Sequence, residues 1–385
     1  MDYRFGIEEE FFVVCDRSGR IEAEADEIFL ERAEQLSDGR VERELLQSQV
    51  EAATSVCRDF ETARSELNLI RSALAVAGAE TGRSVIAAGT HPTARWAMQR
   101  SSDKLRYHAV VAELQMLAQR NLVCGLHVHV EVHDPELQIS VMRRALPYLP
   151  ILLALSTSSP FWQGRRTGFA SYRLTSYDEM PRTGLPPLFW SRAEYTNYVG
   201  MLQDAGFIED PSYIWWAIRP SSKYPTLELR IADACTSLDD ALAIAAVFRC
   251  LVRHLVEDRT LNAGITSPGR AIVEENKWRV QRFGLKAELI NPFGGSISIT
   301  AEDAARRLVA MLEPDAARLD CSRELARARQ ILSEGTSADT QLSVYEHAIA
   351  DGAGEDEALQ CVLAWLQKET HAGRKCPQSQ RTPAE

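Results

Sequence analysis

The heptapeptide FGIEEEF, residues 5–11, stands close to the start of the chain and sets the pattern from which the fold can be predicted. Successive side chains of a β-strand point to opposite faces of its sheet. As a strand, this stretch would carry Glu8 and Glu10 on one face. A strand with one polar and one apolar face is typical of an antiparallel sheet that packs against helices on one side only.

Two further stretches repeat this alternation, GLHVHVE at residues 125–131 and TLELRI at residues 226–231. The ionisable residues on their polar faces include His127, His129, Glu228 and Arg230. Any one of these faces could simply be solvated, as antiparallel sheets often are. However, carboxylate, imidazole and guanidinium groups are those that bind hard cations and phosphates. The three stretches together therefore predict a metal-lined basin on one face of a sheet.

Glu44 and Glu51 extend this prediction to a fourth segment. Their separation of seven residues (51 minus 44) puts them on one side of a helix but on opposite faces of a regular strand. We expect a bend or a helix-to-strand junction that brings both carboxylates to the basin. The alternative is that they are two ordinary surface glutamates.

Arginines in two places could bind anionic substrates. The glycine-containing loop at residues 158–173 carries Arg165 and Arg173, and Arg219 directly follows an apolar stretch at residues 213–218. Planar guanidinium groups suit bidentate binding of a carboxylate or a phosphate. We predict that Arg219 contacts a phosphate, whereas the loop could also be an ordinary charged surface loop.

Thr90 and His91 follow a short apolar stretch at residues 84–88 that reads as a buried strand. Residues directly after the end of such a strand could contact a substrate. A turn or capping role is an equally good interpretation for Thr90, because hydroxyl side chains often bond to the backbone in turns.

The remaining sequence predicts an α+β fold. Three-four spacing of apolar residues predicts helices, and runs of β-branched residues predict strands at residues 84–88, 121–132, 213–218 and 226–232. The expected helices cover residues 58–81, 103–120, 134–155, 192–204, 238–257, 268–282 and 302–312, followed by further helical segments up to residue 366. The helix at residues 134–155 is expected to be interrupted at its prolines. Strands and helices do not alternate strictly and no composition shift marks a linker. We therefore expect one domain over residues 1–369 with a largely antiparallel sheet, and a flexible tail over residues 370–385.

Composition and charge narrow the classes of function. The formal net charge of -11 argues against a nucleic-acid surface and is compatible with binding multivalent cations. No apolar run reaches the roughly 20 residues needed to span a bilayer, and the N-terminus shows no signal-peptide pattern, so we expect a cytoplasmic protein without a membrane partner. The eight cysteines form no Cys-x-x-Cys pair and are expected to be reduced. Because no glycine-rich phosphate loop is present, any ATP must be held by metals and arginines.

Several motifs in the same order resemble the glutamate-cysteine ligase type 2 family of carboxylate-amine ligases, over roughly residues 3–368. The matching stretches are FGIEEEF (5–11), GTHP (89–92), GLHVHV (125–130), SSPF (158–161), RP (219–220) with PTLELR (225–230), and ENKWR (275–279). The resemblance implies a glutamine-synthetase-like fold, in which an antiparallel sheet covered by helices forms a funnel for ATP and amino acids. It also implies a homodimer.

The resemblance further implies a site. The residues that match the metal-binding positions are Glu8, Glu10, Glu44, Glu51, His127 and Glu228. Arg230, with Glu228, matches the catalytic position near the transferred phosphoryl group, and Arg165 and Arg173 lie where glutamate's carboxylates are expected. We assign Arg219 and His129 to ATP, and Thr90 and His91 to substrate. Magnesium, or manganese, is the expected metal.

The predicted reaction is ATP-dependent ligation. ATP would convert the γ-carboxylate of glutamate to an acyl phosphate, and an amine such as that of cysteine would then attack it to give γ-glutamylcysteine. Alternatives are a ligase that joins glutamate or another carboxylate to a different amine, and a guanidino-kinase-like phosphotransferase. A metabolite-binding protein and a metal-dependent amide hydrolase are further alternatives from other classes.

Overall fold

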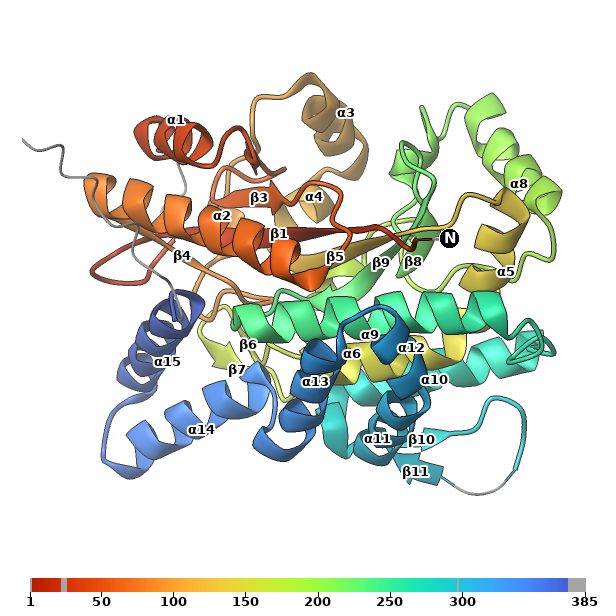
Figure 1. Ribbon diagram of the computed structural model, residues 1–385. Helices are drawn as coiled ribbons and strands as arrows, with labels where there is room; N and C mark the ends of the chain where they lie inside the picture. Colours follow the sequence, from red (N-terminus) through yellow and green to blue (C-terminus); the bar gives the residue numbers. More distant parts are fainter. Residues whose placement is uncertain (1, 22–25, 296–297, 373–385) are drawn as a thin grey trace, which may run out of the picture.

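Strand β1 (Phe5–Cys15) lies at the centre of the main sheet in the computed structural model, which describes residues 2–21, 26–295 and 298–372 (Figure 1). The sheet runs in the order β2, β3, β1, β5, β9, β8, and β4 also pairs with β1. The bounds of these strands are β2 (Val41–Arg43), β3 (Gln49–Ala53), β4 (Arg83–Ile86), β5 (Gly125–Glu131), β8 (Ile218–Pro220) and β9 (Thr226–Asp233). All of these pairings are antiparallel. The predicted α+β class with an antiparallel sheet is confirmed.

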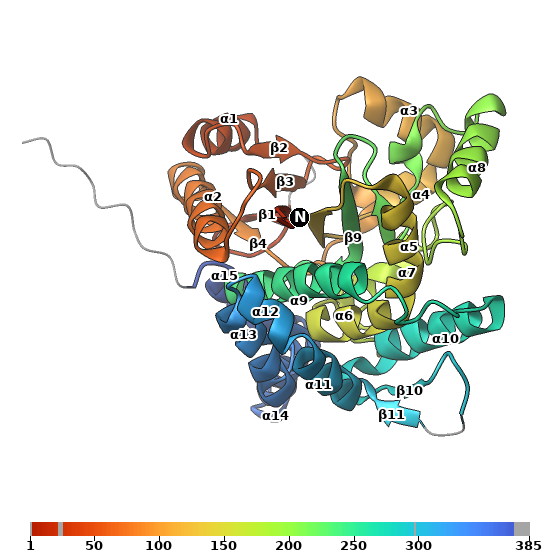
Figure 2. The ribbon, with the colours of Figure 1, turned by 45° about the vertical axis from the view of Figure 1, so that its right-hand side comes forward.

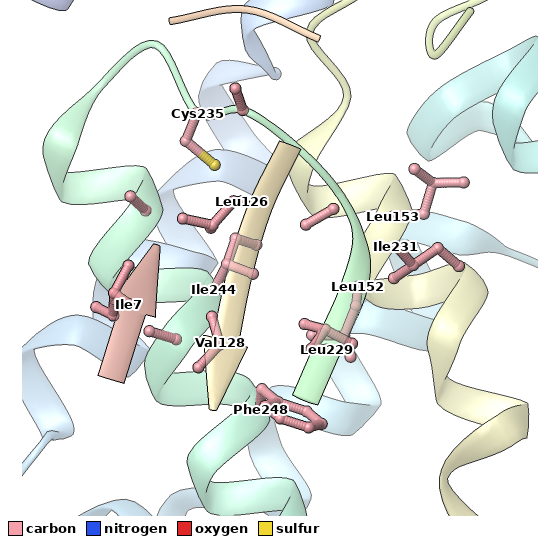
Figure 3. Close-up of a cluster of buried hydrophobic side chains, with 14 of the residues drawn as sticks. Ile7, Leu126, Val128, Leu152, Leu153, Leu229, Ile231, Cys235, Ile244 and Phe248 are labelled. Carbon is pink, nitrogen blue, oxygen red and sulfur yellow. The ribbon is translucent and has the colours of Figure 1, made fainter. Parts of the chain in front are cut away.

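Helices cover the apolar face of this sheet. Figure 3 shows side chains of β1, β5 and β9 packed against α6 (Leu149–Ser156) and α9 (Leu238–Glu257). The labelled residues are Ile7, Leu126, Val128, Leu152, Leu153, Leu229, Ile231, Cys235, Ile244 and Phe248, and all of them are buried. Helix α2 (Phe60–Thr81) also packs on this side, through residues such as Phe60 and Leu67. Burial of the apolar residues of each strand thus fixes which face is left for polar groups.

A second group of helices lies beyond α6 and α9, on the side away from the sheet (Figure 2). It comprises α10 (Ser267–Phe283), α11 (Ala301–Met311), α12 (Glu313–Arg318), α13 (Ser322–Glu334) and α14 (Ser337–Ala350), and α15 (Glu355–Thr370) follows α14 and packs against β4. This region matches the helical pattern predicted from residue 237 onward, apart from a small hairpin of β10 (Glu288–Ile290) and β11 (Ser298–Thr300). Three-residue strands give too short an alternation to be distinguished from a loop.

The remaining helices surround the polar face and its edges. They are α1 (Glu27–Leu36), α3 (Leu105–Leu114), α4 (Met116–Arg120), α5 (Pro135–Ala145), α7 (Arg173–Tyr177) and α8 (Arg192–Asp204). The helix predicted at residues 103–120 is in fact two helices, because Gln115 adopts a positive φ of 51° between them. The strand predicted at residues 213–218 is wrong over most of its length, since only Ile218 at its end enters β8.

One segment differs from the prediction that no span of membrane length exists. Residues 135–156 form α5, a short 3₁₀ turn and α6, and they are long and apolar enough to cross a bilayer by length and composition alone. However, 83% of the most apolar window is buried inside the fold. Contact with the sheet and with α9 accounts for its apolar character.

The end of α15 corrects the boundary of the expected tail. Thr370 is the last residue of this helix and is fully buried. Its hydroxyl oxygen accepts a hydrogen bond from the backbone N–H of Ala87 at 3.1 Å. The rest of the expected tail, from residue 373 on, lies outside the described residues.

An ion pair between Glu9 and Arg71 joins these layers within the core. Arg71 of α2 binds both carboxylate oxygens of Glu9, at 2.5 and 3.1 Å, and both side chains are almost completely buried. The same guanidinium group donates to the backbone carbonyls of Cys235, Thr236 and Thr370. One side chain thus connects β1, the start of α9 and the end of α15, and satisfies a charged glutamate on the otherwise apolar face.

Replacement of Arg71 should therefore strongly destabilise the fold. Arg71→Met leaves Glu9 buried without a partner, and we expect a loss of about 3 to 5 kcal/mol in the free energy of unfolding. Arg32→Met is the matched control, because Arg32 pairs with Glu80 on the exposed surface. Urea unfolding measures both variants. Equal stability of Arg71→Met and the unchanged protein would contradict this role for the buried pair.

Candidate functional site

The polar face of the sheet forms the floor of a cavity of about 490 Å³. The three strands predicted from their alternation meet here, with β1 and β9 on either side of β5. The predicted residues that line the cavity are Glu8, Glu10, Glu44, Glu51, His127, His129, Arg173, Arg219, Glu228 and Arg230. The structure thus brings ten of the predicted side chains together.

The strand register arranges these side chains in three rows across the sheet. In the inner row, Glu51 lies opposite Glu10, whose carboxylate accepts a 2.5 Å hydrogen bond from the backbone N–H of Gly125. In the middle row, Glu8 lies opposite His127. A register shift between β5 and β9 leaves Arg230 near His127, since Val128 pairs with Leu229 and Leu126 with Ala232.

The outer row contains His129 opposite Gly6 on one side and Glu228 on the other, followed by Arg219. In the inner and middle rows the carboxylates lie on β3 and β1, whereas Arg230 of β9 and Arg219 of β8 lie on the other side, with the carboxylate of Glu228 at the border between them. The cavity therefore has a cation-binding half and an anion-binding half.

Glu44 reaches the inner row because β2 and β3 form a hairpin. Glu44 lies in the turn after β2, where its backbone N–H donates to the carbonyl of Gln49 at 3.3 Å. The bend predicted between Glu44 and Glu51 is thus a tight strand-to-strand turn. A carboxylate oxygen of Glu10 lies within 4.8 Å of one from each of these two glutamates.

Three groups of side chains have the spacing of a metal site. They are Glu10 with Glu44 and Glu51, Glu8 with Glu51 and His127, and Glu8 with His129 and Glu228, and within each group the ligand atoms lie within 4.8 Å of one another. They contain all six of the metal ligands predicted from the sequence. They also include His129, which we had assigned to ATP.

The electrostatics of these groups suit a hard cation. Burial, and then the neighbouring Glu44, raises the pKa of Glu10 to about 7. Burial, and then the nearby glutamates, raises the pKa of Glu51 well above its usual value. Burial would also raise the pKa of Glu8, but hydrogen bonds to His127 and His129 hold it well below the usual range. Carboxylates this close repel one another, and a divalent cation would remove that repulsion.

His127 offers an independent sign of a metal site. Its Nε2 atom is buried and lacks a hydrogen-bond partner in the described part of the chain. Burial, and then Arg230, lowers its pKa to about 4, so the ring is neutral at pH 7. Nδ1 of His127 lies 3.3 Å from Glu8 Oε2. If Nδ1 carries the proton and donates to Glu8, the lone pair of Nε2 is free to bind a metal ion. Because five of the seven candidate ligands are carboxylates, the donor set as a whole fits magnesium or manganese.

Two arginines bracket Glu228. Arg219 donates from Nε and Nη2 to the two oxygens of Glu228, at 2.7 and 3.0 Å, and Arg230 donates to Oε1 of the same carboxylate. Burial would raise the pKa of Glu228, but these two cations lower it below the usual value. Arg230 also donates to the hydroxyl of Tyr177 at 3.2 Å. Both guanidinium groups are thus held rigidly at the cavity.

Arg173 differs from these arginines because its acidic neighbours, Asp233 and Glu10, interact with its charge only at longer range. Its side chain is only 1% exposed, and no carboxylate lies within 4.0 Å of it in the part of the chain that the structure describes. Its Nη1 donates to the carbonyl of Arg230 at 3.2 Å, and its Nε has no partner. A buried guanidinium group that lines a cavity and keeps an N–H without a hydrogen-bond partner is suited to bind an anion.

Gly125 explains how Arg173 reaches the sheet. A Cβ atom at Gly125 would lie 2.2 Å from Nη2 of Arg173, so only glycine leaves room for this guanidinium group. Arg173 therefore occupies the position of a missing side chain in the inner row, beside Glu10. The sequence indicated a strand at Gly125 but gave no sign of this contact.

Three predicted substrate residues do not line the cavity. Arg165 is exposed in the hairpin of β6 (Phe161–Trp162) and β7 (Arg165–Arg166). Thr90 is buried, and its hydroxyl donates to the carbonyl of Phe161 at 2.7 Å. His91 is buried as well, with Nε2 2.8 Å from the carbonyl oxygen of Gly19. The structure thus places none of the three at the cavity, since Arg165 lies on the exposed hairpin, the loop at residues 158–173 covers Thr90, and Gly19 contacts His91.

The cavity also contains residues that sequence reasoning missed. They are Lys104, Arg106 and Tyr107 at the start of α3, Gln49 of β3, Tyr177 of α7, and Lys223 and Tyr224 of the turn between β8 and β9. Helix α3 was predicted, but its amphipathic pattern could not indicate that its polar side faces a cavity. The aromatic and neutral residues carried no motif.

These pKa shifts predict that magnesium binding depends on pH. A proton on Glu10 competes with the metal up to pH about 7. We expect Mg²⁺ affinity to rise by about tenfold per pH unit below that value for the proton of Glu10 alone, and the raised pKa of Glu51 should make the dependence steeper or extend it to higher pH. Calorimetry in two buffers of different ionisation enthalpy measures the released protons. An affinity that does not change between about pH 5.5 and 7 would contradict the assignment of Glu10.

The comparison with known sequences gives one consistent family. Residues 4–361 match the model of glutamate-cysteine ligase family 2. A protein of Bradyrhizobium diazoefficiens named "Putative glutamate--cysteine ligase 2" is 45% identical over 97% of this chain and 85% of its own length. A protein of the same name from Rhodospirillum rubrum is 43% identical over 96% of both chains.

Solved structures agree in fold. A glutamate-cysteine ligase of Francisella tularensis, crystallised in complex with AMP, matches with a TM-score of 0.71 over 97% of this chain and 90% of its own, at 12% identity. A bifunctional glutathione synthetase of Pasteurella multocida matches with a TM-score of 0.66 over 94% of this chain and 52% of its own, at 15% identity. At such low identity the likeness concerns the fold alone.

Proposed function

The chain belongs to glutamate-cysteine ligase family 2 and is an ATP-dependent carboxylate-amine ligase, and we propose that it forms a γ-glutamyl amide through an acyl phosphate. Glutamate is the proposed donor of the carboxylate and cysteine the proposed amine. The observation that carries this proposal is the division of one cavity into a cation-binding and an anion-binding half. A cytoplasmic homodimer remains a prediction from the sequence.

The chemistry explains why such a cavity is needed. A carboxylate is a poor acyl donor because its oxygen is a bad leaving group. In the proposed first step, an oxygen of the γ-carboxylate attacks the γ-phosphorus of ATP, and ADP leaves. Both reactants are anions, so the site must cancel charge and hold them in line. The neutral amine then attacks the acyl carbon, phosphate leaves with the electrons of the C–O bond, and the nitrogen gives up one proton to a base.

Each half of the cavity contributes to this step. Glu8, Glu10, Glu44, Glu51, His127 and Glu228 would hold magnesium or manganese, which neutralises phosphate oxygens when bound. Arg230 lies in the middle row beside His127, and we propose that it stabilises the charge of the transferred phosphoryl group. Arg219, in the outer row, would contact the other phosphates of ATP.

Arg173 is the proposed binding site for a carboxylate of the donor. It lies in the inner row, one row from Arg230, so a dicarboxylate held there could direct its other end toward the middle row. The spacing of alternate residues along a strand, about 6.8 Å, is comparable to the length of glutamate.

The direct test is an assay of products. We expect purified protein with ATP, Mg²⁺, glutamate and cysteine to give γ-glutamylcysteine, ADP and phosphate, detected by mass. A panel of other amines run in parallel identifies the acceptor if cysteine is inactive. Hydrolysis of an amide without ATP, or a stable phosphorylated product without an amide, would contradict ligation.

Two arginines from one loop allow a matched test of substrate binding. Arg173→Met should raise the KM for the carboxylate substrate by at least tenfold, since loss of a charged hydrogen bond costs about 1.5 to 3 kcal/mol. Arg165→Met should leave it unchanged, because that side chain is exposed outside the cavity. Steady-state kinetics at saturating ATP compares them. The reverse pattern would restore Arg165 as the substrate residue.

Arg230 should affect the chemical step rather than binding. Arg230→Lys keeps the charge but loses the planar fork that contacts Glu228 and Tyr177. We expect kcat to fall by roughly a hundred- to a thousandfold, while the affinity for ATP changes little. Kinetics and nucleotide calorimetry together measure this. An unchanged kcat would remove Arg230 from the phosphoryl site.

A further inference from the structure

An exposed aromatic residue stands at the rim of the cavity on a rigid turn. Tyr224, between β8 and β9, lines the cavity and is 58% exposed. The backbone N–H groups of Lys223 and Tyr224 both lie 3.3 Å from the hydroxyl oxygen of Ser221, to which they donate. The carbonyl of Tyr224 accepts from the N–H of Thr226 at 2.8 Å. These hydrogen bonds fix the backbone of the turn, which therefore presents the aromatic ring to solvent at the rim.

The ring lies next to the outer row. Its centroid is 6.3 Å from that of the His129 ring, and the two planes are almost perpendicular. His129 in turn lies between Gly6 and Glu228 in the sheet. Tyr224 is thus beside the end of the cavity that is farthest from Arg173.

Gly6, on the other side of His129, has no side chain and so leaves an opening next to the residues that line the cavity. It lies on the same face of β1 as Glu8 and Glu10, and its φ is not positive, so the backbone does not require glycine. A Cβ atom there would meet nothing closer than 3.9 Å. Glycine inside a strand weakens the strand and often marks a close approach of a ligand.

If the proposed function holds, the order of the three rows across the sheet determines the direction in which the nucleotide lies in the cavity. The carboxylate substrate at Arg173 occupies the inner row, and the transferred phosphoryl group meets it near Arg230 in the middle row. The other phosphates must then extend toward Arg219 in the outer row. The nucleoside follows them and leaves the phosphate region beside His129.

We propose that Tyr224 is the platform on which the base of the nucleotide stacks, with the nucleoside crossing His129 over the opening at Gly6. This inference rests on the proposed function and adds the site of the base to it. Stacking recognises the planar, aromatic character of a base without hydrogen bonds to its edges. An exposed tyrosine on a rigid turn offers such a face at little cost in conformational entropy.

The test separates base binding from phosphate binding. Calorimetry with Mg²⁺ compares ADP with inorganic tripolyphosphate, which has no base. Tyr224→Ala should weaken ADP binding by roughly five- to 150-fold, as expected for the loss of one stacked base, and leave tripolyphosphate binding unchanged. Tyr224→Phe should retain the affinity for ADP. Phe207→Ala is the control, since Phe207 is equally exposed but lies outside the cavity.

A second variant tests the opening. Gly6→Val should also weaken ADP binding by at least fivefold while tripolyphosphate binding persists, with circular dichroism to verify the fold. Unchanged ADP affinity in Tyr224→Ala, or an equal loss for ADP and tripolyphosphate, would overturn the inference. Failure of the unchanged protein to bind either ligand would instead contradict the proposed function.

Discussion

Repulsion among carboxylates on one face of the sheet is the constraint on which the site depends. Glu10, Glu44 and Glu51 have carboxylate oxygens within 4.8 Å of one another, and burial together with this proximity raises the pKa of Glu10 and Glu51. By linkage, the metal-free fold loses stability as pH rises from 4.5 to about 7, because the unfolded chain releases the proton of Glu10 while the fold still holds it. A bound divalent cation would reverse this effect, so metal binding and stability are coupled at this site.

The other face of the sheet provides the stability that tolerates this repulsion. Packing of β1, β5 and β9 against α6 and α9 buries a continuous apolar layer (Figure 3). Glu9, the middle glutamate of the EEE run, points to this layer and is satisfied by Arg71. Two glutamates of the run therefore serve the cavity and the third anchors the core. One residue of shift in register would exchange these roles, so the apolar packing also fixes the chemistry.

Much of the site could be predicted because its floor consists of strands. A period of two is enough to place Glu8 with Glu10, His127 with His129 and Glu228 with Arg230 on shared faces, and the pairing of the strands then brings the faces together. The sequence of a loop has no such periodicity from which the direction of its side chains could be predicted. Arg165 and Arg173 are eight residues apart in one loop, and only the fold shows that the first is exposed and the second is buried beside Gly125. The burial of His91 could not be predicted for a related reason, since it depends on contact with Gly19, a residue distant in the sequence.

The central claim is that this face of the sheet activates a carboxylate by transferring a phosphoryl group to it. The most direct measurement uses glutamate labelled with ¹⁸O in its γ-carboxylate, together with ATP, Mg²⁺ and the accepted amine. An acyl phosphate passes one carboxylate oxygen to phosphorus, so mass analysis should find one ¹⁸O in the phosphate released with each amide. Amide formation with unlabelled phosphate would contradict the account.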